Sequence, residues 1–505
     1  MPPRGFKKNL GQPGVFLATR WRKPRRFDCN LVVIGAGAAG LVTAYIAAAV
    51  KAKVTLIEGH RMGGDCLNTG CVPSKTLIRV ARLLRDLRRA GELGISVASA
   101  QVDFAAVMAR VRSVVRQVEP HDSVARYTGL GVEVIQGQAR ITSPWTVKVS
   151  TEAGQQTLTT RAIVIATGAA PIIPAIPGIE SVRHATSDTV WSLREKPERL
   201  LVLGGGPIGC ELAQAFASLG SQVTLVARSG ILGKEDADAV ALVAAGMRAD
   251  GVRLLTDTDT LRCEVVDGEQ RLIVRQAELE EAIPFDVLLC ATGRKARVTG
   301  FGLEELGITL TKAGTIQVND CLQTRYPNIY ACGDVAGPYQ FTHTAAHQAW
   351  YAAVNALFGG LKSFKADYRV IPWVTFTSPE VARVGLSEAE AQAQGIAHEV
   401  TRFALADLDR AITEGAAHGY VKVLTPPGKD RILGVSIVGE HAGEMLAEFT
   451  LAMKHSLGLN KILSTIHPYP TWSEAAKYAA GEWKRAHAPK RALAWLERFH
   501  AWRRG

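Results

Sequence analysis

Two cysteines, Cys66 and Cys71, stand five positions apart within the segment 63–75 of this 505-residue sequence. The spacing predicts that both thiols lie on one side of the first turns of a helix, close enough to form a strained and reversible disulfide. Cys71 is expected at the positive end of that helix, where the pKa of a thiol falls from about 8.5 toward neutrality. Such a thiolate is both a nucleophile and an electron donor. The helix is indicated by Pro73, which suits a first turn, and by apolar residues at helical spacing among arginines: Leu77, Ile78, Val80, Ala81, Leu84 and Leu87.

The cysteine pair has two other interpretations, a structural disulfide and half of a metal site. A metal site needs further cysteine or histidine ligands at short spacing. None stands near Cys66 or Cys71 in the sequence, so no metal-ligating residue is predicted.

A dinucleotide-binding fingerprint precedes the cysteine pair. A short apolar strand, 31–34, runs into a glycine loop and an alanine-rich helix through Val50, and Glu58 closes the next strand, 54–57. Such glycines let the backbone approach a pyrophosphate at a helix N-terminus, and the acid about 20 residues further on holds a ribose. Strand, helix and acid together predict a dinucleotide site. The glycines of this loop are Gly35, Gly37 and Gly40.

The same pattern returns later in the chain, so two dinucleotides are expected. Strand 200–203 leads into a second glycine loop and a helix predicted from Glu211 to Leu219. The second strand, 223–226, is followed by Arg228 where a carboxylate would be expected. An arginine accepts the 2'-phosphate that an acid repels, so this site favours NADPH over NADH, although an exposed loop arginine is the alternative interpretation. The glycines of this loop are Gly204, Gly206 and Gly209.

Two Ala-Thr-Gly turns reinforce the duplication. Buried strands end at Thr167-Gly168 and at Thr292-Gly293, and prolines after the first turn mark a crossing between domains, with the return over 293–300. A further strand ends in Gly333-Asp334, which would place one carboxylate where the ribityl chain of a flavin could hydrogen-bond. Taken alone, Asp334 is more often a turn residue.

Length and composition limit the number of domains and the cell compartments that fit this chain. A chain of 505 residues should hold three or four domains, and a hydrophobic content of 47% can fill their cores. The sequence has no apolar run of about 18 residues, and the leader, 1–26, lacks the apolar core of a secretory signal. Six of the eight cysteines stand singly, as in a reduced compartment, so a cytoplasmic location is expected.

The net charge of +12 belongs to the two ends of the chain. Residues 1–26 hold eight basic residues and no acid, and residues 482–505 hold seven basic residues and two acids, so the ends total +13 and the body −1. Nucleic acid is therefore not an expected partner. Solvated, partly disordered tails are favoured. The alternative is peripheral contact with an anionic surface, because aromatic and basic residues alternate in a possible amphipathic helix around Trp495 and Trp502.

Taken together, the two fingerprints, the Cys66/Cys71 motif, the Ala-Thr-Gly turns and the Gly-Asp motif resemble the FAD-dependent pyridine nucleotide-disulfide oxidoreductases. This family includes dihydrolipoyl dehydrogenase, glutathione reductase and mercuric reductase. The likeness runs from about Asp28 to Ala480, in order and at matching spacing. It implies an α/β fold with two Rossmann-like domains, for FAD and NAD(P), and a C-terminal α+β dimerisation domain. The expected limits are 1–26 (basic extension), 27–175 and 298–366 (FAD-binding), 176–297 (NAD(P)H-binding), 367–485 (dimerisation) and 486–505 (basic amphipathic tail).

The resemblance also implies roles for individual residues. Cys71 would be the thiol beside the flavin, and Cys66 the interchange thiol that faces the acceptor. Lys75 and Glu211 would form a buried ion pair beside flavin N5, where either charge alone would be costly. One non-covalent FAD per subunit would be held by Gly35, Gly37, Gly40, Glu58, Lys75, Thr167, Gly168 and Asp334, and NAD(P)H by Gly204, Gly206, Gly209, Arg228 and Gly293.

The sequence departs from the family near its end. Relatives carry a histidine base five residues before a glutamate, in an active site shared between two subunits. Here the residue five before Glu474 is Tyr469, and His467 matches a structural histidine of the family more often than the base. Mercuric reductases carry a tyrosine at this position. They also end in a vicinal cysteine pair, whereas this sequence ends in Ala501 to Gly505.

Three functions therefore stay open. The first is a mercuric reductase-like homodimer that passes electrons from NAD(P)H through FAD to the redox disulfide and on to a metal ion or small-molecule acceptor. The second is a dihydrolipoyl dehydrogenase that serves a lipoyl protein, with His467 or water as the base. The third, a non-enzymatic surface-binding protein, is disfavoured by the intact Cys66, Cys71, Lys75 and Glu211.

Overall fold

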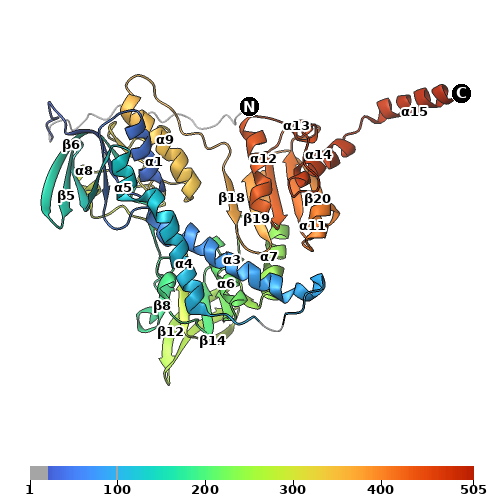
Figure 1. Cartoon of the computed structure of the whole chain (residues 1–505), viewed down its shortest axis with the longest axis horizontal. Coiled ribbons are helices and arrows are strands. Elements are labelled where there is room, and N and C mark those ends of the chain that lie inside the picture. Colours follow the sequence, from blue (N-terminus) through green and yellow to red (C-terminus); the bar gives the residue numbers. More distant parts are fainter. Residues whose placement is uncertain (1–20, 98–99) are drawn as a thin grey trace.

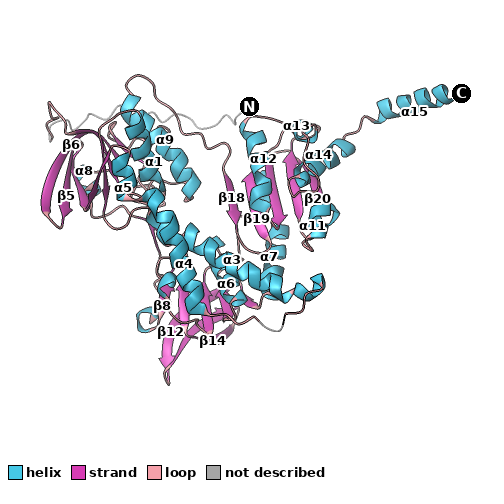
Figure 2. Cartoon of the chain, viewed as in Figure 1, coloured by secondary structure: helices cyan, strands magenta, loops and turns pink. Residues whose placement is uncertain are grey.

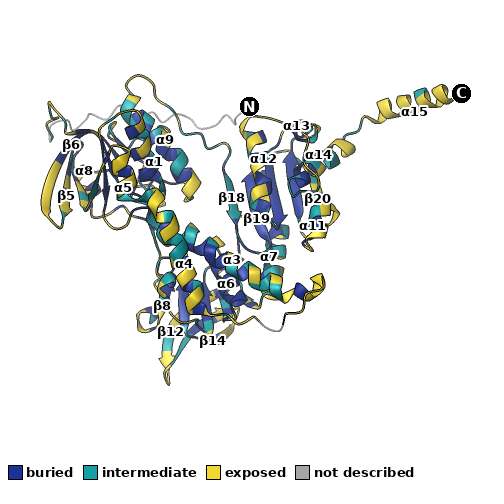
Figure 3. Ribbon diagram, viewed as in Figure 1, coloured by how far each residue is buried: buried dark blue, intermediate teal, exposed yellow. Residues whose placement is uncertain are grey.

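The computed structural model of the chain describes residues 21–97 and 100–505. Its helices and strands gather into three lobes, with a last helix that extends away from the third lobe (Figures 1 and 2). Each lobe contains buried strands, drawn in dark blue in Figure 3, so each lobe has its own core. The basic leader falls largely outside the described residues, except that Trp21 packs edge-on against Tyr326.

The first lobe is built on a strand shared by two sheets. The long strand β6 (Gly154–Ile165) pairs in parallel with β1 and β17 through its second half and antiparallel with β5 through its first half. The resulting parallel order is β3-β2-β1-β6-β17, and β4-β5-β6 form an antiparallel meander. The other strands are β1 (Cys29–Ile34), β2 (Val54–Glu58), β3 (Val132–Gln136), β4 (Gln138–Ser143), β5 (Thr146–Thr151) and β17 (Ile329–Ala331).

Alanines let two helices of this lobe pack closely against each other. Helix α1 (Ala38–Ala49) follows the glycine loop, and α9 (Thr342–Phe358) follows the Gly-Asp turn. Their alanines share one core, with Ala44 and Ala352 fully buried. The remaining helices of this part of the chain are α2 (Gly64–Asn68), α3 (Cys71–Arg88), α4 (Phe104–Val118), α5 (Val124–Gly129) and α8 (Leu303–Leu306).

The second lobe repeats the same plan. Its parallel sheet has the order β11-β10-β9-β15-β8, and β12, β13 and β14 form a separate antiparallel sheet. Helix α6 (Pro207–Ser218) begins four residues earlier than the sequence predicted, because Pro207 occupies its first turn. The other elements are β8 (His184–Thr186), β9 (Arg199–Leu203), β10 (Gln222–Val226), β11 (Val252–Leu255), β12 (Thr258–Val266), β13 (Glu269–Gln276), β14 (Leu279–Phe285), β15 (Val287–Cys290) and α7 (Ala237–Ala249).

The two Ala-Thr-Gly turns lead directly into the connections between these lobes. Strand β7 (Ala169–Pro171) leaves the first lobe, β16 (Arg294–Ala296) returns from the second, and the two pair antiparallel. The predicted crossing is thus a two-stranded ribbon, although the domain limits given above stay a prediction.

The third lobe is a five-stranded antiparallel sheet of order β18-β19-β22-β21-β20. Helices α12 and α14 share its core, in which Phe449 and Ala479 are fully buried. Its strands are β18 (Pro372–Thr375), β19 (Glu380–Gly385), β20 (Glu399–Ala404), β21 (Tyr420–Thr425) and β22 (Gly434–Gly439). Its helices are α10 (Glu388–Ala393), α11 (Asp409–Thr413), α12 (Ala442–Lys454), α13 (Leu459–Leu463), α14 (Glu474–Ala486) and the projecting α15 (Lys490–Arg504).

The structure thus has the mixed α/β fold that the sequence predicted, with two similar dinucleotide-binding sheets and a C-terminal antiparallel domain. Among the residues described, no helix is both long and apolar enough to cross a membrane. The favoured interpretation of 486–505 was a solvated, partly disordered tail. The segment is solvated, since α15 has no buried residue, but residues 490–504 form one continuous helix.

Candidate active site

The two cysteines lie on separate helices. Cys66 lies within α2, and Cys71 is the first residue of α3, so the prediction of a single helix is wrong. The reason is Gly70, whose backbone (φ −114°, ψ −106°) is not helical and caps α3. Both cysteines are present as free thiols, Cys66 partly covered and Cys71 exposed. Their hydrogen bond brings the sulfurs together, as the reduced form of the predicted redox pair requires.

The pair is electrostatically asymmetric. A hydrogen bond from the Cys66 thiol, with help from the Thr342 hydroxyl and the Lys75 ammonium, lowers the pKa of Cys71 to about 6. The same hydrogen bond and burial raise the pKa of Cys66. Thr342 Oγ1, at the start of α9, lies 3.5 Å from Cys71 Sγ. At neutral pH Cys71 is therefore the thiolate and Cys66 the thiol, as the sequence predicted from the helix end alone.

Lys75 and Glu211 form the predicted ion pair, although only Glu211 is buried, since the Lys75 side chain is 37% exposed, and the place of the pair beside flavin N5 stays a prediction. Lys75 lies one helical turn after Cys71, and its Nζ lies 2.7 Å from Glu211 Oε2. The other Glu211 oxygen accepts a hydrogen bond of 2.9 Å from the backbone N–H of Phe376. Lys75 Nζ also lies 4.3 Å from the centroid of the Phe376 ring. A residue of the third lobe therefore contacts both charges of the pair.

A second charge cluster stands beside Cys66, and the sequence analysis missed it. The Asp65 carboxylate pairs with the guanidinium of Arg294, and Arg297 Nη1 lies 3.8 Å away from it. Both arginines also approach Asp188, at 3.5 and 4.0 Å. Burial raises the pKa of Asp65, and the two arginines oppose that rise. The cluster ties the redox helix α2 to β16 and to the loop after β8.

The turn that separates the cysteines is held by the second lobe. Thr69 Oγ1 donates to Asp188 Oδ1 at 3.4 Å, and the Trp191 indole N–H donates to the Thr69 carbonyl at 2.7 Å.

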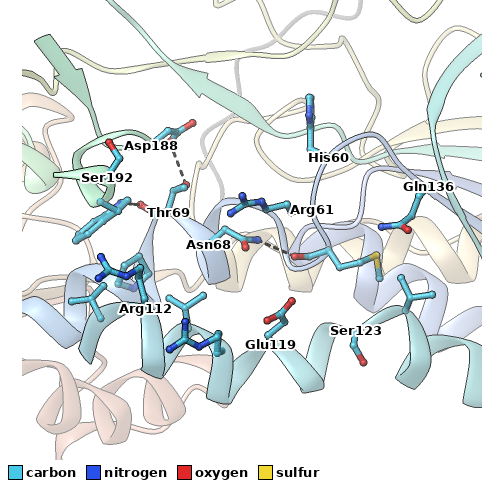
Figure 4. Close-up of a pocket in the computed structure, with 17 residues that line it drawn as sticks. His60, Arg61, Asn68, Thr69, Arg112, Glu119, Ser123, Gln136, Asp188 and Ser192 are labelled. Carbon is cyan, nitrogen blue, oxygen red and sulfur yellow. Dashed lines mark hydrogen bonds between the residues drawn. The ribbon is translucent and has the colours of Figure 1, made fainter. Parts of the chain in front are cut away.

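A cavity of about 600 Å³ opens beside this turn (Figure 4). Its lining includes Asn68, Thr69 and several basic side chains but neither cysteine, so it is separate from the thiol pair. The polar and charged side chains that Figure 4 labels are His60, Arg61, Asn68, Thr69, Arg112, Glu119, Ser123, Gln136, Asp188 and Ser192.

The first glycine loop has the shape of a phosphate cradle. Gly35 has a φ of +102°, and a Cβ there would lie 2.4 Å from the Ala166 carbonyl oxygen. A Cβ on Gly40 would lie 1.7 Å from the Gly35 oxygen, so only glycine lets α1 start here. At Gly37 the nearest atom to such a Cβ is the Gly64 Cα, 3.8 Å away, which leaves room above the helix N-terminus. These features fit the pyrophosphate of a dinucleotide.

The acidic residues predicted for FAD lie around this loop. Glu58 accepts hydrogen bonds from the backbone N–H groups of Ala36 (2.6 Å) and His60 (2.7 Å), so it fixes the loop, and its contact with a ribose stays a prediction. Asp334 is half-buried, and no described residue forms a hydrogen bond with its carboxylate. Burial raises its pKa, so a polar partner such as a ribityl hydroxyl would satisfy it. Thr167 donates to the Arg297 carbonyl at 2.8 Å, and Gly168 has a φ of +67°.

The second glycine loop reproduces the first. Gly204 has a φ of +112°, and a Cβ there would lie 2.4 Å from the Ala291 oxygen, while Gly206 has nothing within 4 Å of such a Cβ. Gly209 stands against the Gly204 carbonyl as Gly40 stands against that of Gly35. Arg228 is exposed after β10 and makes no ion pair or hydrogen bond with the described residues, so it is free to bind a phosphate. Gly293 (φ +129°) begins the return to the first lobe.

The three C-terminal candidates lie together in the third lobe, and within the described part of the chain their side chains form hydrogen bonds only with residues of that lobe. The Tyr469 hydroxyl donates to Asp409 Oδ2 at 2.9 Å, which raises the pKa of the phenol. The His467 side chain is 5% exposed, and its Nε2 lies 3.0 Å from Glu448. Glu474 accepts hydrogen bonds from the Thr471 N–H and the Tyr478 hydroxyl, both at 3.3 Å. Tyr469 is thus hydrogen-bonded to Asp409 instead of to Glu474.

Several contributors to the site carried no usable sequence signal. Asp65, in α2, and Asp188 and Arg297, in loops, are ordinary polar residues until the fold brings them together. Thr342 and Phe376 are far from the cysteine motif in the sequence. Asp65 stands in the cysteine segment, 63–75, and Arg294 and Arg297 stand in the return segment, 293–300, but neither pattern indicated that these residues would meet.

Two glycine cradles and a thiol pair beside a lysine–glutamate ion pair define a flavin-dependent disulfide oxidoreductase. The chain belongs to the pyridine nucleotide-disulphide oxidoreductase family, whose sequence profile matches residues 29–349 and whose dimerisation domain matches residues 371–480. These matches confirm the predicted family, fold and enzyme class, so the interpretation as a non-enzymatic protein is wrong. FAD is the cofactor of this family. When bound, FAD transfers two electrons between a nicotinamide and the thiol pair.

Similar proteins carry more than one name. Dihydrolipoyl dehydrogenase of Chlamydia trachomatis is 36% identical over 461 residues, which cover 90% of this chain and 97% of that protein. Mercuric reductase of Streptomyces lividans is 35% identical over 455 residues, with coverage of 89% and 95%. A similar solved structure is the Cu(II) complex of the HOCl-induced flavoprotein disulfide reductase RclA from Escherichia coli. It superposes on this chain with a TM-score of 0.80 at 28% sequence identity, and the match covers 90% of this chain and 99% of that chain.

Proposed function

We propose that this protein is a mercuric reductase-like enzyme, which passes electrons from NADPH through FAD to Cys66 and Cys71 and on to an acceptor that needs no general base. The observation that carries the proposal is the hydrogen bond from Tyr469 to Asp409, because it raises the pKa of the residue at the base position. A phenol held in this way is a poor proton acceptor at neutral pH. It still offers an oxygen ligand.

The two thiols have separate tasks in this proposal. Cys71, the thiolate, faces the flavin, and the Lys75–Glu211 pair supplies fixed charge beside the reacting ring. Cys66, whose pKa is raised, is the thiol that exchanges with the acceptor once it loses its proton. Reduction of the disulfide by two electrons and two protons gives the dithiol that the structure describes.

The acceptor that we propose is a soft metal ion. Two adjacent thiols bind such ions tightly, and they release their protons on binding. Mercuric reductases are among the similar proteins, and a Cu(II) complex is known for a similar flavoprotein, which supports this choice. The phenol of Tyr469 would come from the second subunit, because it lies in the domain through which the family dimerises.

For the coenzyme we propose NADPH. Arg228 stands at the end of β10 where an acid would hold the 2'-hydroxyl of NADH, and it is unpaired within the described chain. We also propose a cytoplasmic location, on the basis of the scattered single cysteines.

One observation favours the second candidate, dihydrolipoyl dehydrogenase of a lipoyl protein. His467 is paired with Glu448, and a carboxylate orients an imidazole in the way that a general base requires. This candidate predicts that dihydrolipoamide reduces the flavin rapidly and that His467→Ala abolishes the reaction.

The deciding experiment measures steady-state NADPH oxidation by the FAD-loaded enzyme with Hg(II), Cu(II) and lipoamide as separate acceptors. The proposal expects turnover with one of the metal ions, slow turnover with lipoamide, and loss of both in Cys66→Ser. Rapid lipoamide turnover without metal-ion turnover would contradict it. Cys321→Ser, which removes a partly covered thiol outside the pair, is the matched control.

A further inference from the structure

The last helix, α15, presents an unusual surface. It spans Lys490–Arg504 and has no buried residue. It is joined to α14 by only three residues, 487–489, and extends away from the third lobe (Figure 1), exposed along its length in Figure 3. A helix that buries nothing on its own subunit gains no stability from packing there. Its sequence is therefore not explained by the core of the domain.

One face of α15 is aromatic. Trp495, Phe499 and Trp502 follow one another at intervals of four and three residues, which places them on the same side of the helix. The Trp495 and Phe499 rings stack with centroids 5.5 Å apart, and Phe499 and Trp502 lie 6.2 Å apart. Trp495 is 63% exposed and Trp502 is 78% exposed. Two large rings thus stand in solvent on a continuous apolar face.

Arginines flank this aromatic face. Arg491 and Arg498 each precede a tryptophan by four residues and so lie beside it, and the Arg503 guanidinium lies 5.9 Å from the centroid of the Phe499 ring. The helix holds five basic residues and one acid, a net charge of +4, while residues 27–481 have a net charge of −1. Of the net charge of +5 on residues 482–505, +4 therefore lies on the projecting helix.

From these observations we propose that α15 docks the enzyme on an anionic phospholipid surface, with the helix lying in the plane of the interface. Tryptophan prefers the boundary between headgroups and acyl chains, where its ring is buried and its N–H stays hydrated. Arginines at the same depth would pair with lipid phosphates, while the lysine-bearing side of the helix stays in water. The contact is peripheral, since a 15-residue helix with five basic residues does not cross a bilayer.

A second copy of this chain and a nucleic acid are the other conceivable occupants. A second copy fits less well, because the body of the chain is nearly neutral and offers no excess of acid to five basic residues. A nucleic acid would leave the aromatic face uncovered, since Trp495 and Phe499 already stack on each other at an interplanar angle of 9°. A lipid surface satisfies the aromatic and the basic side chains together.

The test uses the intact, FAD-loaded enzyme in vesicle co-sedimentation. Vesicles of phosphatidylcholine with one-third phosphatidylglycerol should retain the protein, and pure phosphatidylcholine vesicles should bind it at least tenfold more weakly. The double variant Trp495→Ala/Trp502→Ala should bind the anionic vesicles at least tenfold more weakly than the unmodified protein. The double variant Arg491→Gln/Arg498→Gln should bind them roughly tenfold more weakly, and its affinity for neutral vesicles should change far less.

Leu493→Ala is the matched control, because Leu493 is 50% exposed on the opposite side of the same helix. It should bind like the unmodified protein, and every variant should keep the rate of flavin reduction by NADPH. Equal binding of the tryptophan variant would overturn the proposal. So would dissociation of the dimer in that variant, seen by sedimentation velocity, or tighter binding to duplex DNA than to the anionic vesicles. None of these outcomes depends on the identity of the electron acceptor.

Discussion

Asp65 and Arg294 form an ion pair that joins the redox helix to the strand on which the chain returns from the second lobe. Asp65 directly precedes Cys66, the proposed interchange thiol, and Arg294 follows the second Ala-Thr-Gly turn. Arg294 is 15% exposed and also donates to the Ala169 carbonyl of the outgoing strand at 3.0 Å. The position of Cys66 thus depends on contacts that span more than 200 residues of sequence.

Asp65→Asn should weaken this junction. The amide keeps the size of the carboxylate but loses its charge, and Asp65 is about one-third exposed, so we expect a loss of about 1–2 kcal/mol in the free energy of unfolding. The measurement is the shift of the thermal unfolding midpoint. Arg140→Gln is the control, since its pair with Glu305 is half-exposed on both sides and should cost almost nothing. Equal shifts for the two variants would show that the Asp65 pair is only a surface contact.

The roles of the two thiols are separable by substitution. Cys66→Ser should leave Cys71 permanently free, so that its thiolate gives a long-wavelength absorbance against oxidised FAD without any reductant. Cys71→Ser should abolish this band at every stage of reduction. The check is an anaerobic titration of the purified protein with NADPH, followed by absorbance. Identical spectra for the two variants would contradict the roles assigned to Cys66 and Cys71.

The reactivity of Cys71 should follow its lowered pKa. Below pH about 6 this group is protonated, so its alkylation by iodoacetamide should fall about tenfold per pH unit, and above pH 7 the rate should level off. An ordinary thiol would continue to gain reactivity up to pH 9. Thr342→Val removes one hydrogen bond to the thiolate and should shift the profile to higher pH. Peptide mass spectrometry resolves the sites, and Cys332, whose pKa burial raises to about 12, should stay unlabelled as an internal control.

Arg228 should select the coenzyme. A charge-assisted contact with the 2'-phosphate contributes about 1.5–3 kcal/mol, which corresponds to a roughly tenfold to hundredfold preference for NADPH in kcat/KM. Arg228→Ala should lose this preference. Arg253 lies on the neighbouring strand and is already paired with Glu281 at 2.7 Å, so Arg253→Ala should keep the preference for NADPH. Equal kcat/KM values for NADPH and NADH in the unmodified enzyme would contradict the proposed contact.

Tyr469 should limit activity with dihydrolipoamide. A histidine of pKa about 6.5 mostly accepts protons at pH 7, whereas a phenol near pKa 10 does so about once in a thousand, a difference of about 4 kcal/mol. The hydrogen bond to Asp409 raises the phenol's pKa further. Tyr469→His should therefore increase lipoamide turnover and leave flavin reduction by NADPH unchanged. Strong lipoamide turnover that survives Tyr469→Phe and disappears in His467→Ala would identify His467 as the base.

The parts of the site that sequence could predict are those built from local motifs. The glycine loops and the buried strands that lead into them each depend on neighbours within about 20 residues, and both were found where the sequence predicted them. The turn at Gly70 was missed because five residues suffice for either one helix or two. The contacts of Lys75 with Phe376 and of Cys71 with Thr342 were missed because each joins residues about 300 positions apart. Such contacts are set by how the lobes pack and leave no periodic trace in the sequence.

The contact of Phe376 with Lys75 and Glu211 makes the third lobe part of the reaction centre within one and the same chain. Without Phe376, one oxygen of the buried Glu211 would lose its hydrogen-bond donor, and one face of the Lys75 ammonium would lose its aromatic cover. The order in which the molecule gains its properties follows from this. Because Phe376 follows both dinucleotide-binding lobes in the sequence, the surroundings of the Lys75–Glu211 pair are complete only once the third lobe has been synthesised and has docked.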